Sequence, residues 1–339
     1  MANSYLIKEA SLVDIANKIR NLTNSENKLT IADISSAIDN EKQNLDAAIA
    51  VLVERGIEVP EGATSADLAG LIDLIEGSSA SAFPEFTYSG TYELIDDGLA
   101  ADGKTQNWRV KFLTSGVLTF SKLGSGEKGI SFFCVGGGGG GGCYKGLTGH
   151  GGGGGYIKSG NAYPLLDTAY QIVVGAGGSG AATGEEGNNG SDGGTTIAFD
   201  VSANGGKGAT IYKGGDGASG GGAGANLEHV SAGAGGSNGA NGGTAYNFSP
   251  GTGSGITTRE FGDSDGELYS GGGGGENGYA YGDGVIAHAA GGAGGGGSGG
   301  GENGKTNTGG GGGGGRGSGN YPIAAGHGGS GIVIIRNIR

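Results

Sequence analysis

Proline and long apolar runs are scarce in this 339-residue chain, and each absence excludes a class of structure. There are 5 prolines, whereas a collagen triple helix needs abundant proline and a glycine at every third position. The sequence has no apolar run of about 18 residues or more, so it predicts no transmembrane helix. The first residues lack the basic stretch and apolar run of a secretory signal, so we expect synthesis in a cytoplasm without a signal peptide.

Basic residues and cysteines are also few. Lysine and arginine total 20 against 33 aspartates and glutamates, which gives a formal net charge of −13. An acidic chain without basic clusters does not suit nucleic acid or an anionic membrane surface. Cys134 and Cys143 do not make a disulfide framework or a four-ligand zinc site. We expect two reduced thiols, with a single bridge between them as the alternative.

Glycine is the residue in excess, at 87 positions. Eleven glycines lie in residues 1–133, which leaves 76 for residues 134–339. Glycine has no side chain to bury, so the second part cannot form the single core of an ordinary enzyme. The composition therefore predicts a multi-domain chain whose C-terminal half is mostly non-α.

Residues 1–77 have the apolar spacing of helices. One face of the first expected helix carries apolar residues at helical spacing, namely Leu12, Ile15, Ala16 and Ile19. A shift of 34 residues aligns Thr30–Ile34 with Thr64–Leu68. This repeat predicts two αα-hairpins that form a small attachment domain. The tetratricopeptide pattern has a similar period, but its Trp, Gly and Tyr positions are absent. Residues 78–84 are small and polar, which predicts a linker.

Residues 85–135 change to the period of a β-strand and predict a small β section. Trp108, Val110 and Phe112 alternate with charged residues, as in a half-buried strand. A Ser-Gly turn and a second apolar stretch follow, so we expect a hairpin over residues 107–121. A further strand over 130–135 runs directly into a run of seven glycines.

Residues 136–339 alternate about a dozen glycine-dense runs with short ordinary segments. One interpretation is a flexible linker, because glycine loses the most backbone entropy on ordering. The other is a bundle of polyglycine II struts, extended helices of the polyproline II type with three residues per turn. Recurrent runs of comparable length and interspersed strand-like segments favour the ordered bundle. Those segments are Tyr170–Val174, Thr195–Phe199 and Ile332–Ile335.

Three motifs in this half carry a resemblance to a known family. They are Phe132-Phe-Cys-Val before the first glycine run, Gln171-Ile-Val-Val-Gly-Ala-Gly-Gly178, and the closing Gly329-Ser-Gly-Ile-Val-Ile-Ile-Arg336. They resemble the glycine-rich domain of bacteriophage tail fibre and tail-tip proteins. The N-terminal Tyr5-Leu-Ile-Lys-Glu-Ala-Ser-Leu12 is similar to the starts of tail-associated proteins from phages of Gram-positive bacteria.

The resemblance implies a non-catalytic adhesin of a phage or prophage tail. In such adhesins, stacked polyglycine II helices form a rigid sandwich whose end loops contact the bacterial surface. The expected partners are a bacterial surface receptor (a glycan or an outer surface protein) and other tail proteins, the latter bound through residues 1–80. By analogy with fibre symmetry we expect a homotrimer located in the virion.

The expected receptor-binding residues lie between the glycine runs. Aromatic rings beside carboxylates and amides suit sugars, because the ring covers the apolar C–H face and the polar groups bond hydroxyls; tyrosine is also an efficient contact residue on loops. The alternative is that these rings close the end of the bundle. The candidates are Tyr246, Phe248, Arg259, Phe261, Tyr269, Tyr279, Tyr281, His288 and Tyr321.

No metal, cofactor or catalytic site is expected. The four histidines have no metal-ligand spacing, and Asp263, Asp265 and Glu267 fit neither an EF-hand loop nor a β-roll repeat. Chance Gly-x-Gly-x-x-Gly matches are inevitable in such a chain and carry no weight. Two other functions stay open, an ice-binding bundle and a structural fibre or surface-layer component.

Overall fold

The computed structural model describes residues 83–103, 105–124, 129–144, 148–184, 187–224, 242–243, 258–277, 287–317 and 322–339, with isolated residues between 43 and 59. The chain divides into two compact units, Met1–Ala80 and Ser81–Arg339. In the first unit six isolated residues from 43 to 53 are helical, within a segment where a helix was expected. The rest of the predicted helical repeat lies outside the described residues. No helix in the described part of the chain is long and apolar enough to cross a membrane.

The second unit contains a five-stranded antiparallel sheet with strand order β2-β3-β15-β5-β8. Its strands are β2 (Tyr92–Leu99), β3 (Gln106–Phe112), β15 (Ile332–Asn337), β5 (Ile130–Val135) and β8 (Ile157–Ala162). The last strand in sequence, β15, lies between β3 and β5. The β section predicted over 85–135 is therefore completed by strands from the glycine-rich half, and the two share one compact unit.

A second sheet covers one face of the first. It has the order β1-β4-β9, from Glu85–Tyr88, Gly116–Lys122 and Ala169–Ile172, and a pair β10-β11 (Thr196–Ala198 and Val201–Ala203) lies beside it. The predicted hairpin over residues 107–121 is wrong. Both strands form, but β3 pairs with β2 and β15 whereas β4 pairs with β1 and β9. The turn between them is a corner from one sheet to the other.

Alternation along the strands of the five-stranded sheet gives it two buried faces. Trp108, Val110 and Phe112 face the second sheet, where they pack with Leu118 and Phe120. On the opposite face a second cluster contains residues from β5, β8 and β15 together with Tyr269. This cluster consists of Phe133, Val135, Ile157, Ala218, Tyr269, Ile332 and Ile334. The sheet thus anchors the glycine-rich segments as well as the second sheet.

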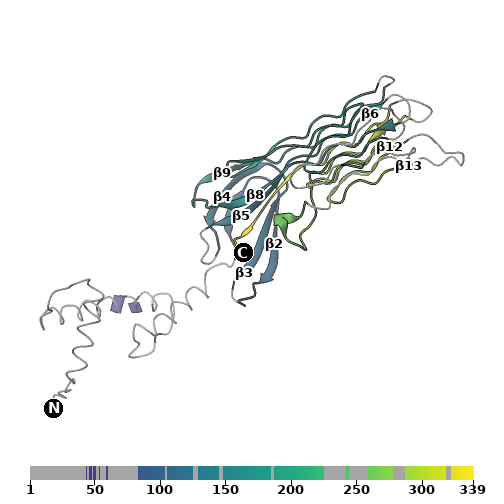
Figure 1. Cartoon of the computed structure of the whole chain (residues 1–339). Helices are drawn as coiled ribbons and strands as arrows, with labels where there is room; N and C mark the ends of the chain where they lie inside the picture. Colours follow the sequence, from purple (N-terminus) through teal and green to yellow (C-terminus); the bar gives the residue numbers. More distant parts are fainter. Residues whose placement is uncertain are drawn as a thin grey trace, which may run out of the picture. The chain divides into compact units, whose positions relative to one another are not determined.

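The glycine-rich segments run from the two sheets as a set of long, parallel and antiparallel extended segments, here called struts (Figure 1). Short paired strands lie at the far end of this bundle: β6 (Cys143–Tyr144), β7 (Thr148–Gly149), β12 (Glu276–Asn277), β13 (Ala287–His288) and β14 (Gly315–Arg316). The helical turn η1 (Glu260–Gly262) lies in a segment beside the five-stranded sheet. The mostly non-α C-terminal half predicted from composition is confirmed.

The central strut, residues 136–143, bonds to a different neighbour at each successive residue. Its amides donate in a three-residue cycle to three antiparallel struts. The first neighbouring strut accepts from residues 136, 139 and 142 through the carbonyls of Tyr156, Gly153 and His150. The second accepts from residues 137, 140 and 143 through the carbonyls of Gly194, Ser191 and Asn188. The third accepts from residues 138 and 141 through the carbonyls of Gly329 and Gly326. Its carbonyls accept in the same cycle from the struts that contain Gly206, Gly178 and Gly312. A β-strand has period two, whereas three residues per turn is the period of a polyproline II helix.

Close packing of these struts explains the unbroken glycine run. A Cβ atom placed on any residue from Gly136 to Gly141 would lie 2.0–2.1 Å from a carbonyl oxygen of a neighbouring strut. The struts that would clash also follow a three-residue cycle, so each position around the central strut faces backbone. Any side chain larger than hydrogen would push two struts apart.

Outer struts show the same period in their exposed residues. In residues 204–210 the side chains of Asn204, Lys207 and Thr210 are exposed, and the residues between them are buried or half-buried. In residues 176–182 the exposed positions are Ala176, Ser179 and Ala182. One residue in three therefore faces solvent, and non-glycine residues are tolerated there.

Both cysteines are buried and free. Burial raises the pKa of Cys134 to about 12 and that of Cys143 to about 11, so both thiols stay protonated at neutral pH. The expectation of two reduced thiols is met, and the alternative of a bridge is not.

Candidate binding sites

The structure describes four of the nine expected contact residues. Tyr246, Phe248, Tyr279, Tyr281 and Tyr321 lie outside the described residues. Arg259, Phe261 and Tyr269 belong to one segment beside the five-stranded sheet, and His288 lies on β13 at the opposite end of the bundle. The structure therefore does not bring these four residues into one site.

The segment 258–270, here called the excursion, forms a loop of two paired arms that packs on the second face of the five-stranded sheet. Its two arms are joined by backbone hydrogen bonds from Glu260 to Glu267 (2.8 Å) and from Tyr269 to Thr258 (2.9 Å). Tyr269 is 2% exposed, and its ring centroid lies 5.6 Å from that of Phe133. Phe261 lies 5.6 Å from the same ring. Both aromatic rings pack into the core here. Their packing therefore fits the alternative that such rings close the bundle better than it fits a role in receptor contact.

Arg259 has a local role in the same segment. Its Nη1 donates to the carbonyl oxygen of Gly266 at 2.9 Å, and its backbone pairs with Leu268. These contacts hold the two arms of the excursion together.

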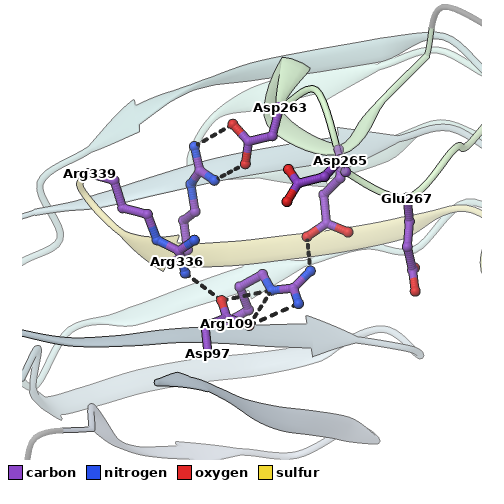
Figure 2. A pocket seen from close by; sticks show the side chains of 9 residues that line it. Asp97, Arg109, Asp263, Asp265, Glu267, Arg336 and Arg339 are labelled. Atoms are coloured by element: carbon purple, nitrogen blue, oxygen red, sulfur yellow. Dashed lines mark hydrogen bonds and ion pairs between the residues drawn. The ribbon is translucent and has the colours of Figure 1, made fainter. Parts of the chain in front are cut away.

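A charged pocket of about 320 Å³ opens between this segment and the sheet. Figure 2 shows arginines from β3 and from the C-terminal strand alternating with carboxylates from β2 and from the excursion. Its lining residues are Asp97, Arg109, Glu260, Asp263, Asp265, Gly266, Glu267, Arg336 and Arg339. Strand alternation explains the arginines, because Arg109 and Arg336 lie on the face opposite Trp108 and Ile335.

Ion pairs already occupy most of the hydrogen-bonding groups of this pocket. Arg109 donates through Nη2 to Asp97 at 2.9 Å and through Nη1 to the buried Glu260 at 2.7 Å. Arg336 pairs with Asp263 and lies over the Phe261 ring at 4.0 Å from its centroid. Arg339 pairs with Asp97. A ligand would have to displace these pairs, so the pocket fastens the excursion and the C-terminal strand to the sheet.

The pKa values in and beside this pocket reflect the pairing. Burial raises the pKa of Asp97, but hydrogen bonds from Arg109 and Arg339 outweigh it and bring the pKa below its ordinary value. The hydrogen bond from Lys111 lowers the pKa of Glu267. Burial and the neighbouring carboxylates raise the pKa of Tyr269, which stays a neutral donor to Glu267 at 2.8 Å.

A second candidate region, here called the loop end, consists of β6, β7, β12, β13 and β14. Three segments outside the described residues, 145–147, 278–286 and 318–321, start and finish here. Their flanking residues are paired with one another: Tyr144 with Arg316, Thr148 with Asn277, Asn277 with Ala287, and Arg316 with Ile323. Gly317 at this end also accepts a hydrogen bond from Gly184 at 2.8 Å. The loop end thus gathers several chain connections around one terminus of the bundle.

A buried ionic series lies under the loop end. Glu276 on β12 is fully buried, with Oε2 at 2.6 Å from Nδ1 of His288 and Oε1 at 3.3 Å from Nε of Arg316. Burial raises the pKa of Glu276, while the contacts with His288 and Arg316 oppose that rise. The His288 side chain is 42% exposed. Of the four described candidates, His288 is the one that reaches solvent at the loop end.

Sequence reasoning missed Glu276, Arg316 and the charged pocket. Glu276 and Arg316 each follow directly after a glycine run. A charged residue at the end of such a run was a sequence signal that could have identified both as candidate site residues. Their pairing across 40 residues could not be read from spacing. In the described part of the chain, no three His, Cys, Asp or Glu side chains gather as metal ligands would.

Comparison with known proteins gives one result for this architecture. A family model described as a glycine-rich domain matches residues 114–337. That range runs from the corner before β4 to the last residue of β15, so it includes the strut bundle and most of the sheets that anchor it. No curated protein matches the chain. Since the match covers well over half of the sequence, the chain belongs to the glycine-rich domain family.

Proposed function

We propose that this protein is a bacteriophage or prophage tail fibre or tail-tip adhesin that binds a bacterial surface receptor, without catalysis. The receptor class we favour is a glycan. The observation that carries the proposal is the loop end: a bundle of struts anchored by two sheets at one end presents several chain connections at the other (Figure 1).

The strut bundle is, in this proposal, a polyglycine II bundle that serves as a rigid spacer. One support is the three-residue cycle of hydrogen bonds around residues 136–143. Another is that carbonyl oxygens of neighbouring struts occupy the space where side chains would otherwise lie. Such packing leaves few ways for one strut to move alone. A stiff support lets loops of varied sequence present contact residues in a fixed arrangement.

Attachment and valency complete the proposal. Residues 1–80 form a separate unit that would join the protein to other tail proteins. A homotrimer in the virion would offer several receptor sites together, so weak individual contacts could still hold a particle on a cell.

A segment exchange tests which end binds. Residues 279–286, which join β12 and β13 at the loop end, would be replaced by a segment of equal length and different sequence. The matched control replaces residues 163–167, which join β8 and β9 at the sheet end and carry the exposed Tyr163, Leu165 and Leu166. Binding of labelled full-length protein would be measured on a panel of bacterial strains.

The expected result is a changed set of bound strains for the 279–286 exchange and an unchanged set for the 163–167 exchange. Thermal unfolding of both proteins should match that of the parent chain. An altered set from the control alone, or no binding by the parent to any strain, would contradict the proposal.

A further inference from the structure

The series Arg316–Glu276–His288 fixes which nitrogen of His288 can face a ligand. An ionised carboxylate accepts hydrogen bonds and cannot donate them. Since Oε2 of Glu276 lies 2.6 Å from Nδ1 of His288, Nδ1 is the nitrogen that carries the proton. In the neutral ring the other nitrogen, Nε2, is then an acceptor. The carboxylate is fully buried, whereas the His288 side chain is 42% exposed.

Two other histidines of the bundle have the opposite arrangement. Nδ1 of His150 accepts a hydrogen bond from the amide of Gly224 at 2.9 Å, and Nδ1 of His327 accepts from the amide of Gly180 at 3.1 Å. In both neutral rings Nε2 therefore carries the proton. His150 is fully buried and His327 is exposed on a strut. His288 thus combines an exposed position at the loop end with an acceptor nitrogen.

The surroundings hold this arrangement in place. A Cβ on Gly300 would lie 2.8 Å from Nδ1 of His288, and one on Gly299 would lie 3.0 Å from Oε2 of Glu276, so two glycines pack directly against the pair. Oε1 of Glu276 and Nε of Arg316 are buried and have no hydrogen-bond partner among the described residues. They face each other as an ion pair at 3.3 Å. The carboxylate is thereby kept beside the imidazole in the absence of any ligand.

We propose that His288 is a specificity-determining contact of the loop end, and that its Nε2 accepts a hydrogen bond from a hydroxyl group of a neutral glycan. Glu276 is its positioning residue. This inference rests on the proposed receptor-binding function and adds the chemical class of ligand that this contact takes.

The charged groups that contact the ring or its carboxylate partner come from two neighbouring strands. The charged groups are Glu276 on β12 and Arg316 on β14, and β6 contributes the titratable Cys143 and Tyr144. The first two cancel, and the thiol is neutral because burial raises its pKa to about 11. The described residues 297–301 and β7 bring no charged side chain to the ring. The contact therefore suits a neutral hydroxyl group rather than a charged one.

The experiment measures binding of the full chain to an array of purified neutral surface polysaccharides from bacteria. His288→Ala should weaken binding about tenfold, the effect of one lost hydrogen bond. His288→Gln, whose side-chain oxygen can accept at a similar distance, should retain binding. His327→Ala, the matched control on an exposed strut, should behave as the parent.

A second readout does not depend on the receptor. Nitrogen-15 NMR of the ring should show His288 protonated at Nδ1 and His327 at Nε2, and Glu276→Gln should reduce the preference at His288. If Nε2 carries the proton in neutral His288, the inference is overturned. Equal binding by His288→Ala and the parent overturns it while leaving the proposed adhesin function standing. Failure of the parent to bind any polysaccharide contradicts the glycan receptor itself.

Discussion

At the scale of single residues, glycine acts here as a spacer between backbones. At Gly139 a Cβ would lie 2.0 Å from the carbonyl oxygen of Lys207. No flexible side chain can move aside to relieve this contact, because the atoms nearest to the Cβ belong to the main chain of Lys207 and Gly208.

Gly139→Ala should therefore destabilise the second unit by about 3 kcal/mol, the upper end of the range for overpacked cores. The matched control is Gly160→Ala on the exposed strand β8, where the nearest atom to the new methyl group is a Phe132 ring carbon at 3.1 Å. Urea unfolding of both variants gives the comparison. Equal stability of the two would mean that the struts are not packed this closely.

Another single-residue prediction concerns His150. Burial lowers its pKa to about 4, whereas in the unfolded chain the imidazole titrates near its ordinary pKa of about 6.5. The folded state binds the proton less well, so its stability falls as pH drops from about 6.5 to about 4, by about 3 kcal/mol in all.

His150→Asn retains an acceptor for the amide of Gly224 and does not titrate. It should remove most of this loss, as seen in urea unfolding at several pH values. His327→Asn, at the exposed histidine with a similar backbone contact, is the matched control for the substitution itself. A profile that is identical for the parent and His150→Asn would show that His150 is protonated equally in both states.

At the scale of elements, the charged pocket fastens the excursion 258–270 to the sheet. Arg109 contacts both Asp97 and the buried Glu260, so Arg109→Met leaves two carboxylates without their main partner. Because Arg109 is a quarter exposed, water screens part of the cost, and we expect a loss of about 2 kcal/mol.

The pH dependence of this pocket has a definite sign. The paired arginines hold the pKa of Asp97 below its ordinary value, so its stabilising contribution is present above the unfolded pKa and is lost as pH falls through the folded pKa. Arg109→Met should lose less stability on acidification below about pH 4 than the parent does. Lys207→Met, at the solvent-exposed pair with Asp192, is the control and should change little. If Lys207→Met lowered the stability by about 2 kcal/mol and Arg109→Met left it unchanged, the pocket would not fasten the excursion to the sheet.

Elements also show where sequence reasoning succeeds. The strands containing Trp108, Ile130–Val135 and Ile332–Ile335 were predictable, because period-two alternation or a short apolar run is a local property. The corner between the two sheets, where a hairpin over 107–121 was expected, was not predictable, because Ser115-Gly116 suits a hairpin turn and a corner between sheets equally well. The choice depends on Phe112 and Phe120 packing across two sheets, which is a long-range property.

At the scale of the whole molecule, the recurrence of the glycine runs and the strand-like segments between them predicted an ordered bundle of extended struts, but not how the struts are arranged. The exposed Asn204, Lys207 and Thr210 recur at every third residue, and this spacing was a readable sign of the strut period. Which strut contacts which was not readable, since glycine runs are nearly identical to one another. Because the sequence does not show which struts are neighbours, the series Arg316–Glu276–His288 could be found only in the three-dimensional structure.

The central claim is that the glycine-rich half is a bundle of struts with a three-residue hydrogen-bond cycle. Site-resolved amide hydrogen exchange on the full chain tests it most directly. We predict slow exchange at every amide from Gly137 to Gly142, since each donates to a neighbouring strut. In the outer strut 188–194, Asn189 and Asp192 should exchange fast, because their amides have no backbone partner among the described residues, whereas Gly190, Ser191, Gly193 and Gly194 should be protected. Fast exchange throughout, or protection that alternates with a period of two, would contradict the account.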